Sequence, residues 1–298
     1  MRSRPALQPP VFIDAIAWWS EEWADWEQAA QALRSSSAAD EEAVGGRIDN
    51  RMAAAADASL QPVRPSPKLL HANERRRAPD AVLLALQVAS SAAAASTLDA
   101  ARLLSVFSSA HGDLPTTDAM CRSLAANPTL LSPTRFHQSV HNAASGYWSM
   151  ASGSHGASTA LAARQHSFAL GWIEAAALCA VEQAPVLLVA FDTEAVGPLA
   201  SVNSNQGLLA VALVLSPRRG PSSAWSVAWG LDDSTADLHT TPLPSCVSQA
   251  RWRHNPTAAA LPLFMALAAA KACRLKLTTT GARPLILQLS PCEPGQPG

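Results

Sequence analysis

The sequence predicts an α/β layered fold with one mixed sheet. Short apolar runs, each the length of a buried strand, alternate along the chain with longer segments of helical periodicity. Two of these runs, 207–217 and 222–231, are separated only by the turn PRRGP, so we expect two adjacent antiparallel strands there. The alternation favours parallel strands and the adjacent pair adds an antiparallel one, which makes the expected sheet mixed.

The composition sets limits on the function. The chain has 298 residues, of which 48% are apolar and 15% charged, so it can bury a sizeable core. Its net charge of −1 gives no electrostatic reason to expect binding to nucleic acid or to an acidic membrane surface. The five cysteines form no CxxC pair and are odd in number, which favours a reducing compartment. We expect neither a metal nor a cofactor.

A leader and a membrane span are not expected either. The apolar run at 11–19 is short and is interrupted by Asp14, which makes it a poor signal peptide. No stretch reaches the roughly 20 apolar residues that cross a bilayer. We therefore expect a cytoplasmic protein.

Proline, glycine, serine and charged residues divide the chain into elements and connections. Strands are expected at 11–19, 102–113, 147–151, 185–194, 207–217, 222–231 and 283–290, and helices at 20–33, 78–93, 116–126, 137–142, from about Gly156, and at 256–272. Residues 1–10 and 291–298 are expected to be loose tails, and 35–67 a variable connection.

Residues 132–163 carry the pattern with the most chemical information. They predict a loop, a short helix, the strand at 147–151, a turn of small residues and then an Ala-rich helix. A strand that enters a tight turn before a helix presents a nucleophile at the helix N-terminus in several classes of enzyme. Ser154 stands at the top of the predicted turn and is the candidate catalytic residue.

Three segments carry a resemblance to a known family. They are NAASGYWSM (142–150), SGSHGASTALAARQHSFALG (152–171) and PVLLVAFDTE (185–194). Together they resemble the β-ketoacyl synthases, and specifically the short branch found in aryl-polyene pigment clusters. The resemblance implies a thiolase-like layered fold, of which only the N-terminal half is present, with a buried central helix.

The resemblance also implies a domain organisation. Residues 11–231 would form the synthase-like N-terminal domain. Residues 232–290 would form a short C-terminal extension with one helix and one strand.

The resemblance bears on catalysis through one departure from the family. In the large synthases the turn carries a cysteine, which takes the acyl chain as a thioester, and Ser154 stands at the matching position. A serine hydroxyl is barely ionised and needs an adjacent base, whereas a thiolate at a helix N-terminus does not. The synthases also have two catalytic histidines, but His239 and His254 stand outside any similar Gly-rich context. We therefore expect no condensing activity from the chain alone.

Other polar residues near the turn do not complete a site. His155 is adjacent to Ser154 and would point in a different direction. His137 and His141 are four apart, which is a metal-ligand spacing, but no carboxylate or cysteine accompanies them, so we expect packing roles. Asp192 and Glu194 follow a predicted strand, where caps and salt bridges are common.

Three residues are candidates for an interface. Tyr147, Trp148 and Met150 lie on the predicted strand 147–151. In the resembled synthases the strand before the turn lies at the dimer interface, and aromatic residues are enriched in such anchors.

Three hypotheses follow for the function. The preferred one is a non-catalytic subunit of the chain-length-factor type, which pairs with a full-length cysteine-bearing ketosynthase, meets an acyl carrier protein and serves fatty acid or polyketide synthesis of the aryl-polyene type. The second is a serine acyl hydrolase or acyltransferase that uses Ser154. The third is a remnant that only binds an acyl carrier protein.

Overall fold

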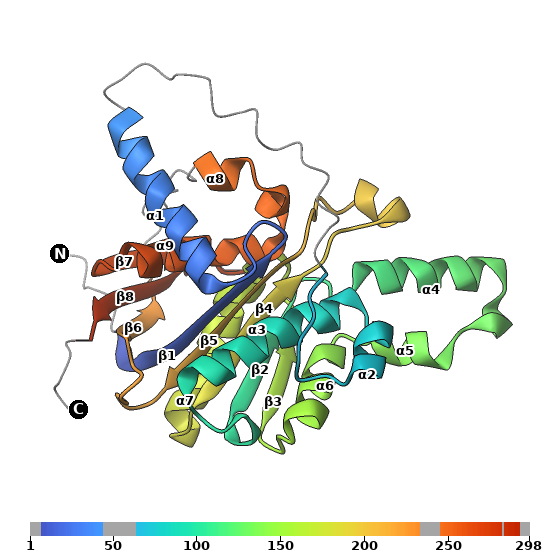
Figure 1. Cartoon of the computed structure of the whole chain (residues 1–298), viewed down its shortest axis with the longest axis horizontal. Helices are drawn as coiled ribbons and strands as arrows, with labels where there is room; N and C mark the ends of the chain where they lie inside the picture. Colours follow the sequence, from blue (N-terminus) through green and yellow to red (C-terminus); the bar gives the residue numbers. More distant parts are fainter. Residues whose placement is uncertain (1–6, 44–63, 233–244, 282, 293–298) are drawn as a thin grey trace.

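One eight-stranded sheet forms the centre of the molecule (Figure 1). The computed structural model describes residues 7–43, 64–232, 245–281 and 283–292. The strands are β1 (Gln8–Ser20), β2 (Leu104–Ser108), β3 (Ser158–Leu161), β4 (Val186–Asp192), β5 (Leu209–Ser216), β6 (Trp225–Leu231), β7 (Cys273–Leu277) and β8 (Leu285–Pro291), in the order β3-β2-β4-β5-β1-β6-β8-β7. The strands β3, β2 and β4 are parallel and every other neighbouring pair is antiparallel, which confirms the predicted mixed sheet.

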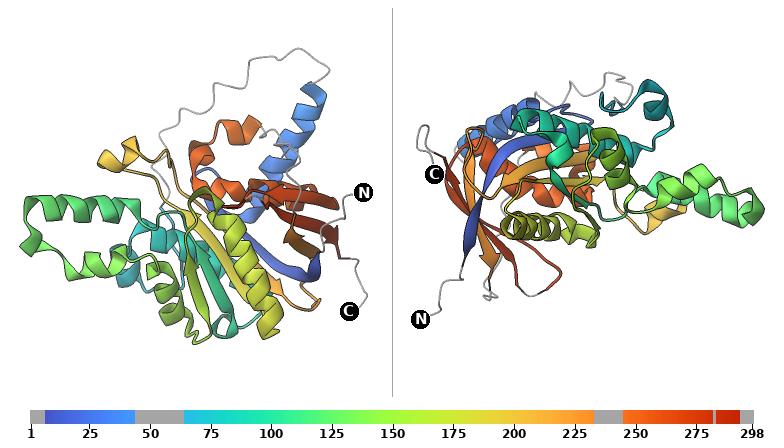
Figure 2. Two further views of the ribbon diagram at one scale, coloured as in Figure 1. Left: turned by 180° about the vertical axis from the view of Figure 1, so that it is seen from behind. Right: turned by 90° about the horizontal axis from the view of Figure 1, so that it is seen from below.

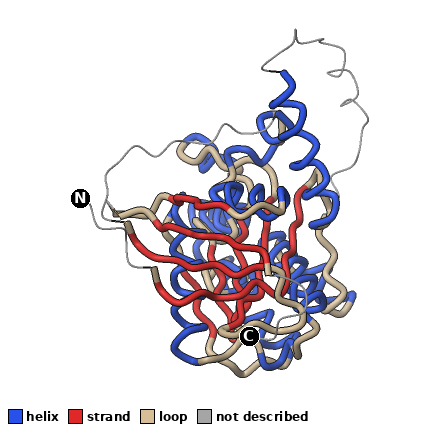
Figure 3. Tube along the Cα trace, turned by 90° about the vertical axis from the view of Figure 1, so that its left-hand side faces the viewer, coloured by secondary structure: helices blue, strands red, loops and turns tan. Residues whose placement is uncertain are grey.

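Helices cover both faces of this sheet. They are α1 (Trp26–Ala43), α2 (Ala72–Arg77), α3 (Asp80–Ser96), α4 (Leu114–Ala126), α5 (Pro133–Ser139), α6 (Ala143–Ser152), α7 (Ser167–Glu182), α8 (Ser245–Ser248) and α9 (Leu261–Ala269), with short 3₁₀ turns η1 (Ala100–Arg102), η2 (Pro128–Leu130), η3 (Arg164–His166), η4 (Gly197–Ser201), η5 (Arg251–His254) and η6 (Pro256–Ala260). Figure 3 shows the strands running through the middle of the molecule between the helices. No helix in the described part of the chain is both long and apolar enough to span a bilayer.

Two apolar cores lie on opposite faces of the sheet. One contains α7, with Phe168 and Trp172 fully buried, together with residues of α1 and α9. The other contains α3 and α6, with Leu84 and Trp148 buried. Figure 2, seen from behind, shows α7 on the face opposite to α3. A Cβ at Gly171 would lie 2.9 Å from the Ser108 Cβ, so glycine lets α7, the expected central helix, approach the sheet closely.

The predicted strand at 147–151 is wrong, because these residues belong to α6. Ala144 and Trp148 are buried four residues apart and Ala151 packs against the same core, which is helical rather than strand spacing. Gly153 then ends the helix in the left-handed conformation, with φ of 70°.

The helix predicted from Gly156 is also wrong. Residues 158–161 form β3, which pairs in parallel with β2, and the helix begins only at Ser167. The alanines here favour a helix by propensity, but the backbone hydrogen bonds to β2 outweigh that preference, as tertiary pairing often does.

The strands β5 and β6 are not neighbours in the sheet, contrary to the sequence prediction. The strand β1 lies between them and pairs with both. Beyond β6, the segment 232–290 adds two strands rather than one, because β8 pairs with β6 and β7 pairs with β8. Most of the predicted connection 35–67, the tail 1–6 and residues 293–298 lie outside the described part of the chain, while α1 extends to Ala43.

Candidate functional site

A tight turn between β3 and α7 has the strand–turn–helix geometry that was expected around Ser154. Ala163 and Arg164 form its tip, and Arg164 has a φ of 54°, in the left-handed region that disfavours side chains. The Ala163 amide donates to Ser167 Oγ at 2.9 Å, and that hydroxyl donates to the Arg164 carbonyl at 2.7 Å. Ser108 Oγ donates to the Ser167 carbonyl at 2.6 Å, which fixes the turn to the end of β2.

This turn offers no nucleophile. Its residues, 162–166, read AARQH and include neither a cysteine nor a serine. The Arg164 side chain is exposed, and a guanidinium has no lone pair to attack a thioester because it stays protonated. The hydroxyl of Ser167, which directly follows the turn, is buried and hydrogen-bonded within it.

Ser154 lies elsewhere, between the end of α6 and the start of β3. Its side chain is buried, and Oγ donates to the Leu103 carbonyl at 3.2 Å while accepting from the Gly156 amide at 3.4 Å. It therefore stands at no helix N-terminus, and its adjacent His155 is exposed. The hydroxyl fills a structural role in this turn.

A buried carboxyl, Asp192, lies at the end of β4. Its Oδ1 accepts from Ser109 Oγ at 2.9 Å and from the Ala110 amide at 2.8 Å, and its Oδ2 accepts from Thr257 Oγ1 at 2.9 Å. The Asn255 side chain donates to its backbone carbonyl at 2.9 Å. Asp192 thus joins the ends of β2 and β4 to η6. Burial raises the pKa of Asp192 to about 7, although hydrogen bonds from Ser109 and Thr257 oppose this rise.

Sequence reasoning found Asp192 but not its partners. Ser109, Asn255 and Thr257 come from segments far apart along the chain, so no local spacing links them. The one available signal is that Ser109 directly follows β2, a strand parallel to β4.

The histidines near the turn do not form a metal site. The helix α5 ends at Ser139, so His137 and His141 do not share a helix face as their spacing suggested. His141 Nε2 lies 3.0 Å from the Ser109 carbonyl and donates to it, because a carbonyl can only accept. Burial lowers the pKa of His111, and the charges of Arg164 and His141 lower it further. Among the described residues, no three His, Cys, Asp or Glu side chains could hold a metal ion.

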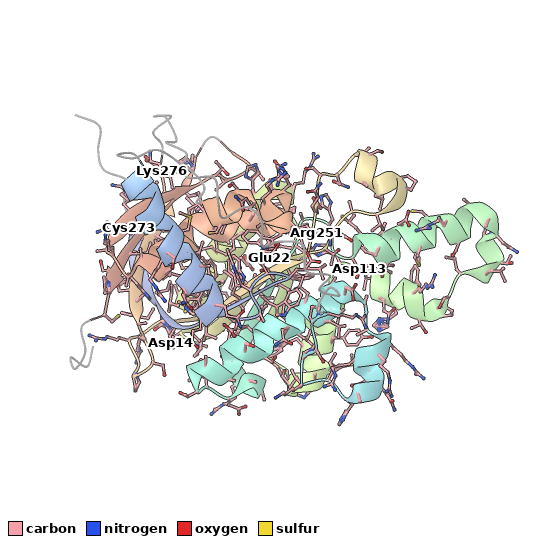
Figure 4. All side chains as sticks on the ribbon, turned by 45° about the horizontal axis from the view of Figure 1, so that its top comes forward. Asp14, Glu22, Asp113, Arg251, Cys273 and Lys276 are labelled. Carbon is pink, nitrogen blue, oxygen red and sulfur yellow. The ribbon has the colours of Figure 1, made fainter. Side chains whose placement is uncertain are left out.

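The other predicted polar residue, Glu194, is in a salt bridge. Its Oε2 lies 2.6 Å from Arg251, which also lies 3.3 Å from Glu21. The Arg251 amide donates to Glu22 at 3.0 Å (Figure 4). Burial is the main cause that raises the pKa of Glu21. These contacts join η5 to the segments after β1 and β4.

The three interface candidates have different surroundings. Trp148 is in the core at 1% exposure, so it offers no surface to a partner. Tyr147 is half-buried against the same core, while Met150 is 69% exposed.

The two edges of the sheet differ in charge. The edge strand β3, with the sequence STAL, has no charged side chain. The opposite edge strand, β7, carries Arg274 and Lys276, and such charges protect an edge against pairing with another chain. The edge at β3 lacks this protection.

Comparisons with known proteins place the chain in a family. Residues 49–279 match the family described as "Beta-ketoacyl synthase, N-terminal domain". A search of curated proteins found no match.

Solved structures share the fold at low identity. One is the ketosynthase ApeO in complex with its chain length factor ApeC from Xenorhabdus doucetiae, at 19% identity and a TM-score of 0.64, covering 95% of this chain and 100% of that chain. AntDE:AntF, a type II PKS acyl-carrier protein in complex with its ketosynthase bound to the hexaketide, is 13% identical with a TM-score of 0.68, and the match covers 95% of this chain and 99% of that chain. The ishigamide ketosynthase/chain length factor is 13% identical with a TM-score of 0.63, and the match covers 95% of this chain and 99% of that chain. The family match spans well over half of the sequence, and the chain therefore belongs to the β-ketoacyl synthase N-terminal domain family.

Proposed function

We propose that this chain is a non-catalytic, chain-length-factor-type subunit that pairs with a full-length cysteine-bearing ketosynthase in the synthesis of fatty acyl or polyketide chains, of the aryl-polyene type. One observation carries the proposal. The turn between β3 and α7 keeps the strand–turn–helix geometry in which the resembled synthases hold their cysteine, but Ala163 and Arg164 stand at its tip. The geometry is retained without the group that performs the chemistry.

The free edge of β3 supports the pairing. In the resembled dimers the strand before the turn pairs with its counterpart across the two-fold axis, and here that strand is β3. Parallel pairing with β2 uses every second residue of β3, as the bonds to the carbonyls of Ala157 and Leu161 show. The backbone groups of Ser158 and Ala160 therefore point away from β2 and are free to pair with a partner strand.

Two of the structures that share the fold are described as a ketosynthase with its chain length factor. In the first, the matched chain is covered over its whole length. This agrees with a subunit of about this size, and the assignment to this chain rests on the turn and the edge strand.

We propose that a second partner, an acyl carrier protein, docks around α2. Lys68, His71, Arg76 and Arg77 are exposed there, and the only carboxylate within α2 is Glu74. Because the whole chain has a net charge of −1, this concentration of positive charge is local. A carrier protein that docks here must present acidic side chains.

The hydrolase hypothesis has no supporting observation. Ser154 is buried, its hydroxyl is bonded to backbone groups, and no base among the described residues is hydrogen-bonded to it. The remnant hypothesis differs from the preferred one in lacking a ketosynthase partner.

Co-expression with the cysteine-bearing ketosynthases of the same genome tests the proposal. We expect one of them to elute with this chain at equal stoichiometry, as measured by light scattering, and to need the chain for condensation. A chain that elutes alone in every case, or a ketosynthase that makes the same product without it, would contradict the proposal.

A further inference from the structure

The second half of the strand β1 has a free edge inside the sheet. On one side β1 pairs with β5 along residues 12–20, but on the other side β6 pairs with it no further than Ile13. The register of β1 shifts next to Asp14, which Figure 4 labels, and the strand then continues to Ser20 without β6. Residues 15–20 therefore have one side that no described strand covers, and we call this side the free edge of β1.

The backbone groups of Ile16 and Trp18 point out of the free edge. The Ser20 amide donates to the Trp23 carbonyl at 2.8 Å, so it points away from β5. Alternate residues of a strand direct their amides and carbonyls to the same side, and the pairing of residues 15–20 with β5 is regular. Ile16 and Trp18 precede Ser20 by an even number of positions and therefore share its direction.

These outward backbone groups have no partner within the described part of the chain. No hydrogen bond from a described residue reaches the outward amide or carbonyl of Ile16 or Trp18. Trp18 is 2% exposed, and its indole Nε1 has no described partner either. Because buried polar groups are nearly always hydrogen-bonded, this edge suits a ligand that supplies both donors and acceptors.

A hollow of about 230 Å³ lies along the free edge. Residues of β1, of the start of α1 and of α3 line it, among them Ile16, Trp18, Asp25, Trp26, Glu27 and Ser91. Pockets for small molecules usually measure roughly 300–1,000 Å³, so this hollow suits a short extended segment better than a whole cofactor.

The two indole rings of the hollow are held in place by other aromatic rings. The ring centroid of Trp18 lies 5.5 Å from that of Trp252 and 5.7 Å from that of Phe264. The ring of Trp26 lies 5.6 Å from the same Phe264, and all three pairs pack edge to face. An indole fixed in this way can bind an ammonium or guanidinium group over its face.

The hollow also carries negative charge. Glu27 is exposed and has no ion pair with a described residue. Asp25 accepts hydrogen bonds from the Gln28 amide at 2.9 Å and from its Nε2 at 3.2 Å, neither of which neutralises the carboxylate. The sequence has no lysine, arginine or histidine in residues 5–33. Charge complementarity therefore favours a ligand with a basic side chain.

We propose that the free edge of β1 is a docking site for an extended peptide segment of another protein. The segment adds a strand along residues 15–20 and places a lysine or arginine side chain in the hollow beside Trp26 and Glu27. In strand addition the main-chain hydrogen bonds give affinity and the side-chain pockets give specificity. The strands β2, β4 and β5 separate β1 from β3, so this contact is distinct from the ketosynthase pairing proposed above and does not depend on it.

Selection from a positional library of acetylated hexapeptides on the full chain tests the chemistry of the ligand. We expect lysine or arginine to be enriched about tenfold or more over aspartate and glutamate at one position. Proline should be depleted at alternate positions, because it has no amide to donate to β1. Enrichment of acidic side chains, or no selection at any position, would overturn the proposal.

Amide hydrogen exchange with the best selected peptide tests the added strand. In the free chain the amides of Ile16 and Trp18 should exchange faster than those of Ala15 and Ala17, which face β5. Saturating peptide should slow the first pair about tenfold or more and leave the second pair unchanged. If the first pair is already as protected in the free chain as the second, the chain's own residues cover the edge, and if the peptide protects neither, it binds elsewhere. Both results contradict the added strand.

Neutral variants test the role of charge. Asp25→Asn combined with Glu27→Gln should weaken binding of the selected peptide about tenfold, and added salt should reduce the difference. Asparagine caps a helix about as well as aspartate, so α1 should keep its stability. The matched control is Glu182→Gln, an exposed carboxylate at the end of α7, which should bind the peptide as wild type does. Equal binding by the double variant and the control would exclude the acidic side chains from the site and overturn the proposal.

The two proposals can fail separately. Co-elution with the ketosynthase should be the same for wild type and for the double variant, because β3 is unchanged. If wild type binds the selected peptide but elutes without any ketosynthase, the docking site stands and the proposed function fails. If wild type pairs with a ketosynthase but the library selects nothing, the proposed function stands and the docking site fails.

Discussion

Asp192 shows how one buried side chain can join three separate segments of the fold. It joins the ends of β2 and β4 to η6 through hydrogen bonds to Ser109, Ala110 and Thr257. Burial raises its pKa to about 7, so the folded chain holds a proton that the unfolded chain releases near pH 4. Because the folded state binds more protons, stability falls as the pH rises from about 4 to about 7.

Asp192→Asn should remove this part of the pH dependence. The amide keeps the shape of the protonated carboxyl and can donate to Thr257 Oγ1. We expect the free energy of unfolding of wild type, measured in urea, to fall by a few kcal/mol more than that of the variant between pH 4 and pH 8. If the free energy of unfolding changes with pH equally in wild type and in the variant, the pKa of Asp192 is not raised.

Ser154→Ala tests the structural role of that hydroxyl. The change removes the bonds to Leu103 and Gly156, so it should cost about 1 kcal/mol of stability and leave condensation by the complex within a few-fold of wild type. Ser154→Cys, the matched change toward the family's nucleophile, should give no new activity. A loss of about 10³-fold or more in Ser154→Ala would restore the hydrolase hypothesis.

At the scale of elements, the proposed function assigns β3 and α2 to different partners. Ala160→Pro removes an amide that points away from β2, so the fold should survive while pairing with the ketosynthase is lost. Ala160→Ser keeps that amide and is the control, which should pair as wild type does. Size-exclusion chromatography of the co-expressed proteins measures how each variant pairs with the ketosynthase. A proline variant that still pairs would exclude β3 from the interface.

The positive charge around α2 should affect the binding of the carrier protein and not the pairing with the ketosynthase. Arg76→Glu with Arg77→Glu should raise the KM for carrier-bound substrate about tenfold, and added salt should reduce the difference. Arg274→Glu, an exposed arginine on the opposite edge at β7, is the control and should leave KM unchanged. If both variants behave alike, α2 is not the docking surface.

The elements differ in how well the sequence predicts them. Apolar strands such as β4 and β5 and the helix α4 with its cap Asp113 follow from local patterns, and they lie within two residues of the predicted bounds. Residues 143–161 do not, because their alanines favour a helix in β3 as much as in α6, and the four residues of β3 become a strand only by pairing with β2. The position of β1 between β5 and β6 depends on pairing between residues that are far apart in the sequence, so a short stretch of sequence cannot predict it.

The same reasoning explains the result at the candidate site. The sequence places the position of the family's cysteine at Ser154 because it predicts a strand at 147–151, where the structure has the helix α6. The turn with strand–turn–helix geometry begins after Leu161. Its left-handed residue is Arg164, whereas glycine or asparagine at that position would have indicated a turn from the sequence. Ser109 and Thr257 could not be linked to Asp192 without the fold.

Taken as a whole, the molecule combines the two-faced core of the synthase fold with an uncharged sheet edge at β3 and a strand–turn–helix junction, residues 162–166, that carries neither cysteine nor serine. Under the proposed function, the edge strand pairs with the ketosynthase and the covalent step takes place in that partner. We therefore expect the ketosynthase partner, and not this chain, to carry the acyl group.

Intact-mass spectrometry of the complex after incubation with an acyl-carrier thioester tests this claim most directly. Both subunits are resolved by mass, so a covalent acyl group can be assigned to one of them. We predict that the added acyl mass appears on the ketosynthase partner, that it is lost when the partner's cysteine is replaced by alanine, and that none appears on this chain. An acyl group on this chain, at Ser154 or at any other residue, would contradict it.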